Sequence, residues 1–175
     1  MQRPFLLGLI ALSFAMYACT SSTPPSHVSP TPSAAPAVGD ACLVGHWKLT
    51  QESVVAPPDS LAGLVGATLL VNPGGDATLT YTHSSPLVGT HDSKPASLAY
   101  TGSLRLTLLA TSPDLAITYV SSATTIATTY QGSTTTYPFA IPSSPAAATY
   151  TCSASALQVV FQSDTYMTTD SYTRG

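Results

Sequence analysis

Apolar and polar residues alternate with a period of two along much of this chain. The pattern is clearest over residues 98–109, where every second residue from Leu98 to Leu108 is apolar or glycine. Successive side chains of a β-strand point to opposite faces, so this spacing predicts strands with one buried and one solvated face. Thr, Val and Tyr, which favour strands, are frequent, and long runs of Ala, Leu, Glu and Lys are missing. The pattern therefore predicts an all-β fold.

Turn sequences divide the chain into strand-sized segments. Residues 72–76 (NPGGD) lie between two such segments and predict a β-hairpin. We also expect a single helical turn over 60–64, a polar loop over 83–97 and a loose segment over 132–147. Eight or nine strands with short connections predict a single antiparallel meander closed into a barrel, because closure removes the exposed edges of an open sheet. The expected strands lie within residues 43–54, 67–71, 77–81, 98–109, 115–120, 124–130, 148–153, 157–162 and 166–174.

The first 18 residues have the composition of an export signal. Arg3 precedes an apolar run over residues 4–18, which is shorter than the roughly 20 residues of a membrane-spanning helix. Residues 16–19 (MYAC) resemble a bacterial lipobox, in which the cysteine is lipidated and the leader is cut before it. The resemblance implies a signal peptide over 1–18, a lipid on Cys19 and anchoring at the extracytoplasmic face of a cell membrane. An ordinary signal cleaved after Ala18 and an uncleaved anchor are the alternatives.

Residues 19–41 predict a tether rather than a folded element. Prolines recur there among Ser, Thr and Ala without any apolar period. The remaining segment, 42–175, is long enough for one domain with a core but not for two. We therefore expect a disordered, membrane-proximal tether followed by a single barrel domain.

The low charge of the chain limits its partners. Only 7% of residues are Asp, Glu, Lys or Arg, whereas about a quarter is usual. After residue 18 there are eight acidic and four basic side chains, a net charge of −4. A nucleic acid backbone would find no basic surface, so this class of partner is excluded. We expect a monomer.

The number of cysteines is odd, which is informative for an exported chain. The three are Cys19, Cys42 and Cys152, and thiols tend to oxidise in extracytoplasmic compartments. If Cys19 carries lipid, Cys42 and Cys152 remain as one pair for a disulfide.

Three features of the barrel segment occur together in a known family. Gly45-His46-Trp47 follows Cys42, Tyr150-Thr151-Cys152 lies near the end, and Arg174 is almost the last residue. Over residues 42–174 this order resembles small bacterial lipocalin-like lipoproteins, in which an arginine of the closing strand lies against the tryptophan of a Gly-x-Trp. The resemblance implies a lipocalin-like β-barrel in which Gly45, Trp47 and Arg174 form a structural plug. A Cys42–Cys152 disulfide would then tie the first strand to a late one.

The aromatic residues are the candidates for lining a ligand site. They are spread over most predicted strands, and about half of the positions in a barrel point inward. From this we expect non-catalytic binding of a small apolar molecule inside the barrel. The alternative is a filled barrel with an envelope-structural or protein-inhibitor role through its outer surface. The candidate lining residues are Tyr81, Tyr100, Tyr119, Tyr130 and Phe161.

Sequence signatures of catalysis are missing. The chain has no Gly-x-Ser-x-Gly, no His-Glu-x-x-His, no Cys-x-x-Cys and no phosphate-binding loop. One loop combines His83, His91 and Asp92, with His46 as a distant fourth group, but this spacing matches no known metal site. We therefore expect no enzyme, no metal and no cofactor.

Overall fold

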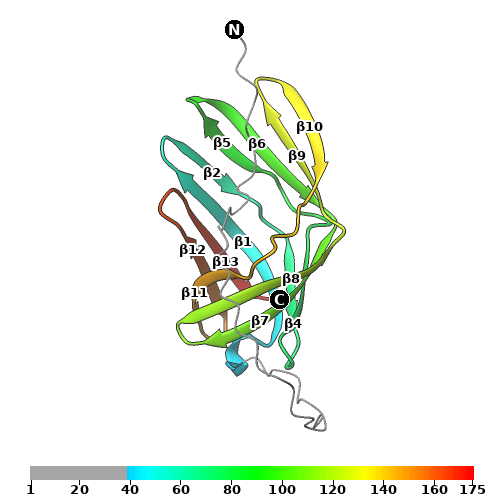
Figure 1. The fold of residues 1–175 in the computed structure, drawn as a ribbon, viewed down its shortest axis with the longest axis vertical. Helices are drawn as coiled ribbons and strands as arrows, with labels where there is room; N and C mark the ends of the chain where they lie inside the picture. The colour runs from blue at the N-terminus through cyan, green and yellow to red at the C-terminus, as the bar shows by residue number, and fades with distance from the viewer. Residues whose placement is uncertain (1–38) are drawn as a thin grey trace, which may run out of the picture. The chain divides into compact units, whose positions relative to one another are not determined.

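A computed structural model describes residues 39–175, so the predicted signal peptide, Cys19 and most of the tether lie outside the described residues. Figure 1 shows an almost purely β architecture with one short 3₁₀ helix. The elements are η1 (Ala41–Leu43), β1 (Gly45–Ala56), β2 (Asp59–Gly63), β3 (Thr68–Val71), β4 (Asp76–Thr80), β5 (Leu87–His91), β6 (Lys94–Thr101), β7 (Ser103–Thr111), β8 (Asp114–Ser122), β9 (Thr125–Tyr130), β10 (Ser133–Pro138), β11 (Ala146–Cys152), β12 (Ala156–Gln162) and β13 (Met167–Arg174).

Eight of the strands close into an antiparallel barrel. The order runs β1, β3, β4, β7, β8, β11, β12, β13 and returns to β1, and every neighbouring pair is antiparallel. The order follows the sequence, so the barrel is an up-and-down meander. The prediction of an all-β chain with one closed antiparallel barrel is confirmed.

The other five strands extend the barrel at one end. β2 lies between β1 and β3 in the sequence, β5 and β6 between β4 and β7, and β9 and β10 between β8 and β11. In an up-and-down meander these three connections fall at the same end, and Figure 1 shows the five strands together there. They continue the sheet outward from β1 in the order β2, β5, β6, β9, β10. We call this the elaborated end, and the opposite end, which carries η1, the plugged end.

A glycine makes the passage from barrel to extension possible. Gly102 separates β6 from β7 and has a φ of +100°, a backbone conformation that residues with a Cβ rarely adopt. A Cβ at this position would also overlap the carbonyl oxygen of Ala123. The hairpin of β7 and β8 can therefore bend here and continue as the pair of β6 and β9.

The core fills the barrel from the plugged end. Inward positions of the barrel strands are buried there, and the burial of β7, β11 and β12 alternates with a period of two, as the sequence pattern predicts. The most deeply buried large side chains are Trp47, Leu43, Leu49, Leu64, Leu87 and Val71.

Several local predictions are wrong because polar strands were not recognised. Residues 60–64 form no helical turn; most of them belong to β2, which pairs with β1 on one side and β5 on the other. The expected polar loop over 83–97 contains β5 and the start of β6, and the loose segment over 132–147 contains β10. The hairpin at 72–76 is confirmed by the pairing of β3 with β4.

Among the described residues, no helix is long and apolar enough to cross a membrane.

Candidate ligand-binding site

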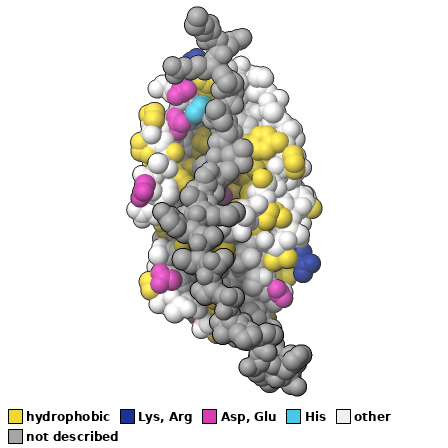
Figure 2. All heavy atoms as spheres, in the orientation of Figure 1, with side chains coloured by type: hydrophobic (Ala, Val, Ile, Leu, Met, Phe, Trp, Pro, Cys, Tyr) yellow, Lys and Arg dark blue, Asp and Glu magenta, His cyan; other side chains and the backbone are white. Residues whose placement is uncertain are grey.

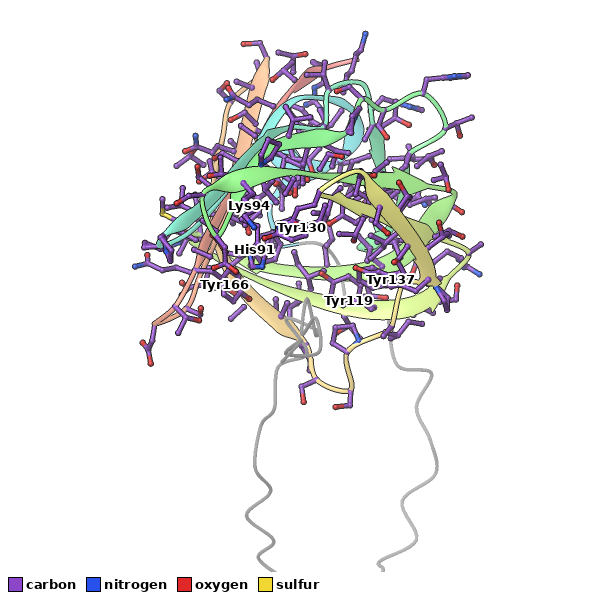
Figure 3. The ribbon with its side chains drawn as sticks, turned by 90° about the horizontal axis from the view of Figure 1, so that it is seen from above. His91, Lys94, Tyr119, Tyr130, Tyr137 and Tyr166 are labelled. Atoms are coloured by element: carbon purple, nitrogen blue, oxygen red, sulfur yellow. A yellow bond between two sulfur atoms is a disulfide. The ribbon has the colours of Figure 1, made fainter. Side chains whose placement is uncertain are left out.

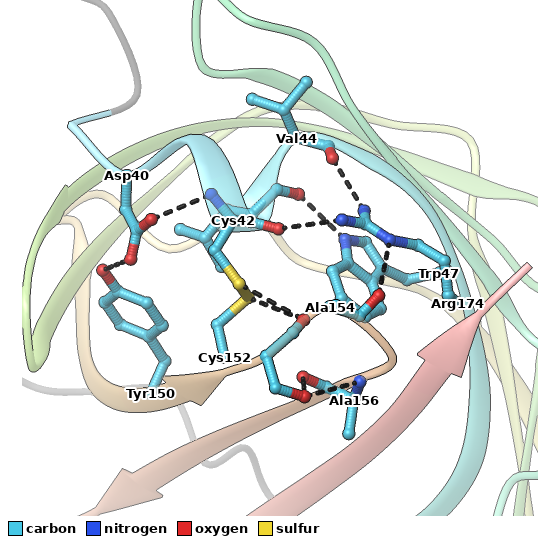
Figure 4. Close-up of a disulfide and its surroundings, with 11 residues drawn as sticks. Asp40, Cys42, Val44, Trp47, Tyr150, Cys152, Ala154, Ala156 and Arg174 are labelled. Carbon is cyan, nitrogen blue, oxygen red and sulfur yellow. Dashed lines mark hydrogen bonds between the residues drawn. A yellow bond between two sulfur atoms is a disulfide. The ribbon is translucent and has the colours of Figure 1, made fainter.

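The plugged end is built around Trp47, which is 1% exposed. Its indole N–H donates to the carbonyl oxygen of Leu43 in η1 at 2.8 Å. The guanidinium carbon of Arg174 lies 4.1 Å from the centre of the indole ring, within the range of a cation–π contact. Arg174 also donates to the carbonyl oxygens of Val44 at 2.7 Å and Ala154 at 3.4 Å (Figure 4). It therefore connects the residue before β1 with the turn between β11 and β12.

Gly45 leaves room for this arginine. Its φ is +134°, and a Cβ added to it would overlap Nη1 of Arg174. Glycine is therefore required at this position for two independent reasons, backbone conformation and space. The structure places Gly45, Trp47 and Arg174 together, as the resemblance implied.

A disulfide and a carboxylate fix η1 to the late strands. Cys42 and Cys152 are bonded, with their Cα atoms 6.1 Å apart (Figure 4), so the predicted pair is confirmed. Asp40 accepts hydrogen bonds from the Cys42 N–H and the Tyr150 hydroxyl, both at 2.8 Å. The Cys42 bond and then the Tyr150 bond hold the pKa of Asp40 below its usual value. These contacts hold η1 against β11.

Toward the elaborated end, two acidic side chains enter the barrel. A bulge at Thr50 adds one residue to β1, so that Leu49 and then Glu52 face inward. Glu52 lies directly opposite Asp170 of β13, and its neighbour on β2 is Gly63, which has no side chain. Adjacent inward positions on two barrel strands are therefore both carboxyls.

The surroundings of this pair disfavour its charged state. Burial, and then the charge of Asp170, raise the pKa of Glu52 to about 8, and burial raises the pKa of Asp170 to about 7. The Tyr172 hydroxyl donates to Oδ2 of Asp170 at 3.3 Å, which partly offsets the burial. Oδ1 of Asp170 is buried without a hydrogen-bond partner among the residues that the structure describes.

Tyrosines from several strands surround the carboxyl pair. Tyr81 and Tyr100 stack with ring centroids 5.1 Å apart, and Tyr119 packs against Phe139 at 5.7 Å. Burial raises the pKa of Tyr81, Tyr100 and Tyr119, to about 12 for Tyr119, and the nearby charges of Glu52 and Asp170 raise each of them further. The three hydroxyls are therefore neutral donors near the carboxyls.

The structure brings most of the predicted lining residues together. Tyr81, Tyr100 and Tyr119 lie around the carboxyl pair, and Phe161 is half-buried against the core. Tyr130 lies further out at the rim, where its ring meets His91 edge-on at 5.4 Å. Figure 3, which looks onto the structure from above, shows Tyr119, Tyr130 and His91 within one ring of strands.

Sequence reasoning missed the two carboxyls. Glu52 is the single glutamate of the chain, and neither it nor Asp170 is among the candidate residues that the sequence suggests. The alternation of β13 places Asp170 on the same face as the buried Tyr172, and this signal was present in the sequence. The inward direction of Glu52 depends on the bulge, which the sequence does not mark.

A cluster of acidic and histidine side chains lies at the rim, but its members differ from the set considered from the sequence, which was His83, His91 and Asp92 with His46. Asp59, His91 and Asp92 have ligand atoms within 4.8 Å of one another, whereas His83 and His46 are not part of this group. His91 Nδ1 lies 2.5 Å from Oδ2 of Asp59, whose Oδ1 accepts the Asp92 N–H at 2.9 Å. Burial acts to raise the pKa of Asp59, but these bonds outweigh it and lower the pKa. The carboxylate of Asp59 and the imidazole of His91 are thus bonded to each other, and Asp92 lies beside them at the rim.

A shallow groove of about 480 Å³ lies on the outer face of the barrel, against β1, β3 and β4. Its side chains point away from the core, since they alternate with the buried Trp47 and Leu69. On the face drawn in Figure 2, charged side chains are few and scattered among polar and apolar atoms. The groove includes His46, Lys48, Thr68, Leu70, Thr78 and Thr80.

Comparison of the chain with protein-family models, curated proteins and solved structures gives no match. The fold is an eight-stranded closed antiparallel barrel with a five-stranded extension.

Proposed function

We propose that this chain is a lipocalin-like small-molecule-binding protein that holds its ligand, without catalysis, at the elaborated end of the barrel. The observation that carries the proposal is the contrast between the two ends. At the plugged end the inward side chains are buried, as Trp47 and Leu49 are. Further along the same strands, inward side chains such as Val54, Tyr119 and Phe161 are apolar or aromatic but only half-buried.

Such a surface gains free energy when a ligand covers it. Each Å² of apolar area removed from water contributes roughly 25 cal/mol, and tyrosine hydroxyls beside it can orient a bound molecule. Binding sites of barrels commonly lie in the open mouth above a packed floor. Here the Trp47 plug and its core would form the floor, and the five additional strands would form the wall.

Lipid attachment at Cys19 belongs to the same proposal. A lipid anchor would keep the barrel at the outer face of a membrane, where apolar molecules partition. The mass of the detergent-extracted chain tests this, because removal of residues 1–18 together with acyl chains on Cys19 gives a defined mass. An unmodified Cys19, or a chain with its leader intact, would refute the anchor and leave the binding proposal standing.

Native mass spectrometry of the full chain, before and after organic extraction, tests the binding proposal. We expect a co-purifying small molecule that extraction removes. Thr168 is an inward position of β13 opposite Val54 and Phe161, so Thr168→Phe should fill the site and abolish the bound mass. Thr169→Phe, which faces outward on the same strand, is the matched control and should retain it.

The opposite result would favour the alternative role through the outer surface. If both variants keep the bound mass equally, the ligand does not occupy the elaborated end. If the wild-type chain carries no small molecule from any host tested, the barrel is better described as filled. A partner protein bound at the outer groove would then be the next hypothesis, tested by a charge change at Lys48.

A further inference from the structure

The carboxyl pair inside the barrel has no cationic counterpart in the described part of the chain. Among the described residues, ion pairs are formed by His91 at the rim, with Asp59 and Asp92. Lys48, Lys94 and Arg105 are exposed, and Arg174 is engaged with Trp47 at the plugged end. Glu52 and Asp170 therefore face the interior with no lysine or arginine between residues 39 and 175 to neutralise them.

A buried carboxylate without a partner is costly, and one oxygen of this pair is such a case. Leaving a buried acceptor unpaired is destabilising, and more so when it is charged. Oδ1 of Asp170 is buried and unpartnered within residues 39–175. Asp170 faces inward, as do the half-buried Val54 and Phe161. A molecule bound there can therefore supply the hydrogen bond or ion pair that Oδ1 lacks. A donor or a cation is the complement that this oxygen requires.

The aromatic rings around the carboxyl pair further limit the chemical class of the ligand. Faces of tyrosine and phenylalanine attract cations, and the attraction is stronger where water is excluded. Tyr81, Tyr100 and Tyr119 lie near both carboxyls, and Phe139 packs against Tyr119. The two carboxyls supply at most four of the six to eight oxygens that Ca²⁺ takes, and the groups around them are mostly aromatic rings. Aromatic walls suit an organic cation better than a metal ion.

On the basis of the proposed function, the geometry points to an organic cation as the ligand. Its ammonium group binds between Glu52 and Asp170, and its apolar body lies against Tyr100, Tyr119 and Phe139. In the empty protein, protons neutralise the pair, since both carboxyls hold protons more tightly than usual. The bound cation replaces this protonation and supplies the missing partner for Asp170 Oδ1.

A matched pair of probes tests the inference on the full chain. We would titrate 2-(1-naphthyl)ethylamine and its neutral isostere 2-(1-naphthyl)ethanol by calorimetry at pH 8.5, above both raised carboxyl pKa values. We expect the amine to bind about tenfold more tightly, equivalent to about 1.4 kcal/mol. Glu52→Gln and Asp170→Asn should each remove this preference and leave the affinity for the alcohol unchanged.

Asp164→Asn is the control, because it removes an exposed negative charge from the β12–β13 loop and should preserve the preference. Thermal melting followed by circular dichroism verifies that each variant is folded. If both probes bind equally, the cation inference is wrong and the proposed function stands. A preference for the amine that survives in both carboxyl variants also overturns the inference. If neither probe binds up to millimolar concentration, the inference and the proposed function both fail.

Discussion

Replacing Glu52 by glutamine should make the empty protein more stable at high pH and leave it unchanged at low pH. In the folded state the pKa of Glu52 is raised from 4.5 to about 8. A raised acid pKa means that folding favours the protonated form, so its contribution to stability is complete below pH 4.5 and is lost as pH rises toward 8. Glutamine keeps the shape and loses the charge. The titratable groups that face Glu52 are Asp170, Tyr81, Tyr100, Tyr119 and Tyr172.

The size of the effect follows from the two pKa values. Each tenfold change in the acid dissociation constant corresponds to about 1.4 kcal/mol, so the full change would cost the ionised form about 5 kcal/mol. The Glu52 side chain is only half-buried, and water screens part of this cost. We therefore expect the variant to exceed the wild type by about 2–4 kcal/mol at pH 9. The tyrosines do not ionise in this range, because burial raises their pKa.

Urea unfolding followed by far-ultraviolet circular dichroism at pH 4.5 and pH 9 measures the difference. Asp40 and Asp59, whose pKa values are lowered, act in the opposite direction in both proteins and cancel in the comparison. Asp164→Asn, which replaces an exposed carboxyl of the β12–β13 loop, is the matched control. Equal free energies of unfolding for wild type and Glu52→Gln at pH 9 would show that Glu52 is solvated, and the interior carboxyl pair would be refuted.

The plugged end gives three further predictions, all measured by urea unfolding. Replacing Cys42 and Cys152 by serine should cost about 4–5 kcal/mol, because the bond closes a segment with a sequence separation of 110; an unchanged midpoint would contradict a stabilising bond. Trp47→Ala should cost about 3–5 kcal/mol and Trp47→Phe clearly less, because phenylalanine keeps a ring in the plug; equal losses would argue against packing as the cause. Gly45→Ala should cost about 1–3 kcal/mol through its positive φ and the overlap with Arg174, and a neutral result would refute both reasons.

The barrel itself could be predicted from the sequence where strands have one apolar face. β7, β8, β11 and β12 alternate clearly because one face packs on the core. The Cys42–Cys152 bond and the contact of Trp47 with Arg174 were expected from the order of a few residues, and the geometry contains both.

Only part of the extension could be predicted: β9 and the end of β6 lie within the expected strands 124–130 and 98–109, whereas β2, β5 and β10 lack that signal. All six residues of β10 are exposed, and within residues 39–175 this edge strand pairs with β9 alone. β2 is short and follows two prolines, so its sequence did not distinguish a strand from a helical turn. The interior carboxyls were missed for a related reason: one additional residue at Thr50 reverses which side of β1 faces inward.

Isotope-filtered NOE spectroscopy of the labelled full chain with 2-(1-naphthyl)ethanol tests the binding proposal most directly. If the ligand binds at the elaborated end, we expect contacts from naphthyl protons to the methyl groups of Val54 and Leu98, which are half-buried and face inward there. Contacts to Leu70 and Thr78 would instead place the ligand in the outer groove and contradict the account.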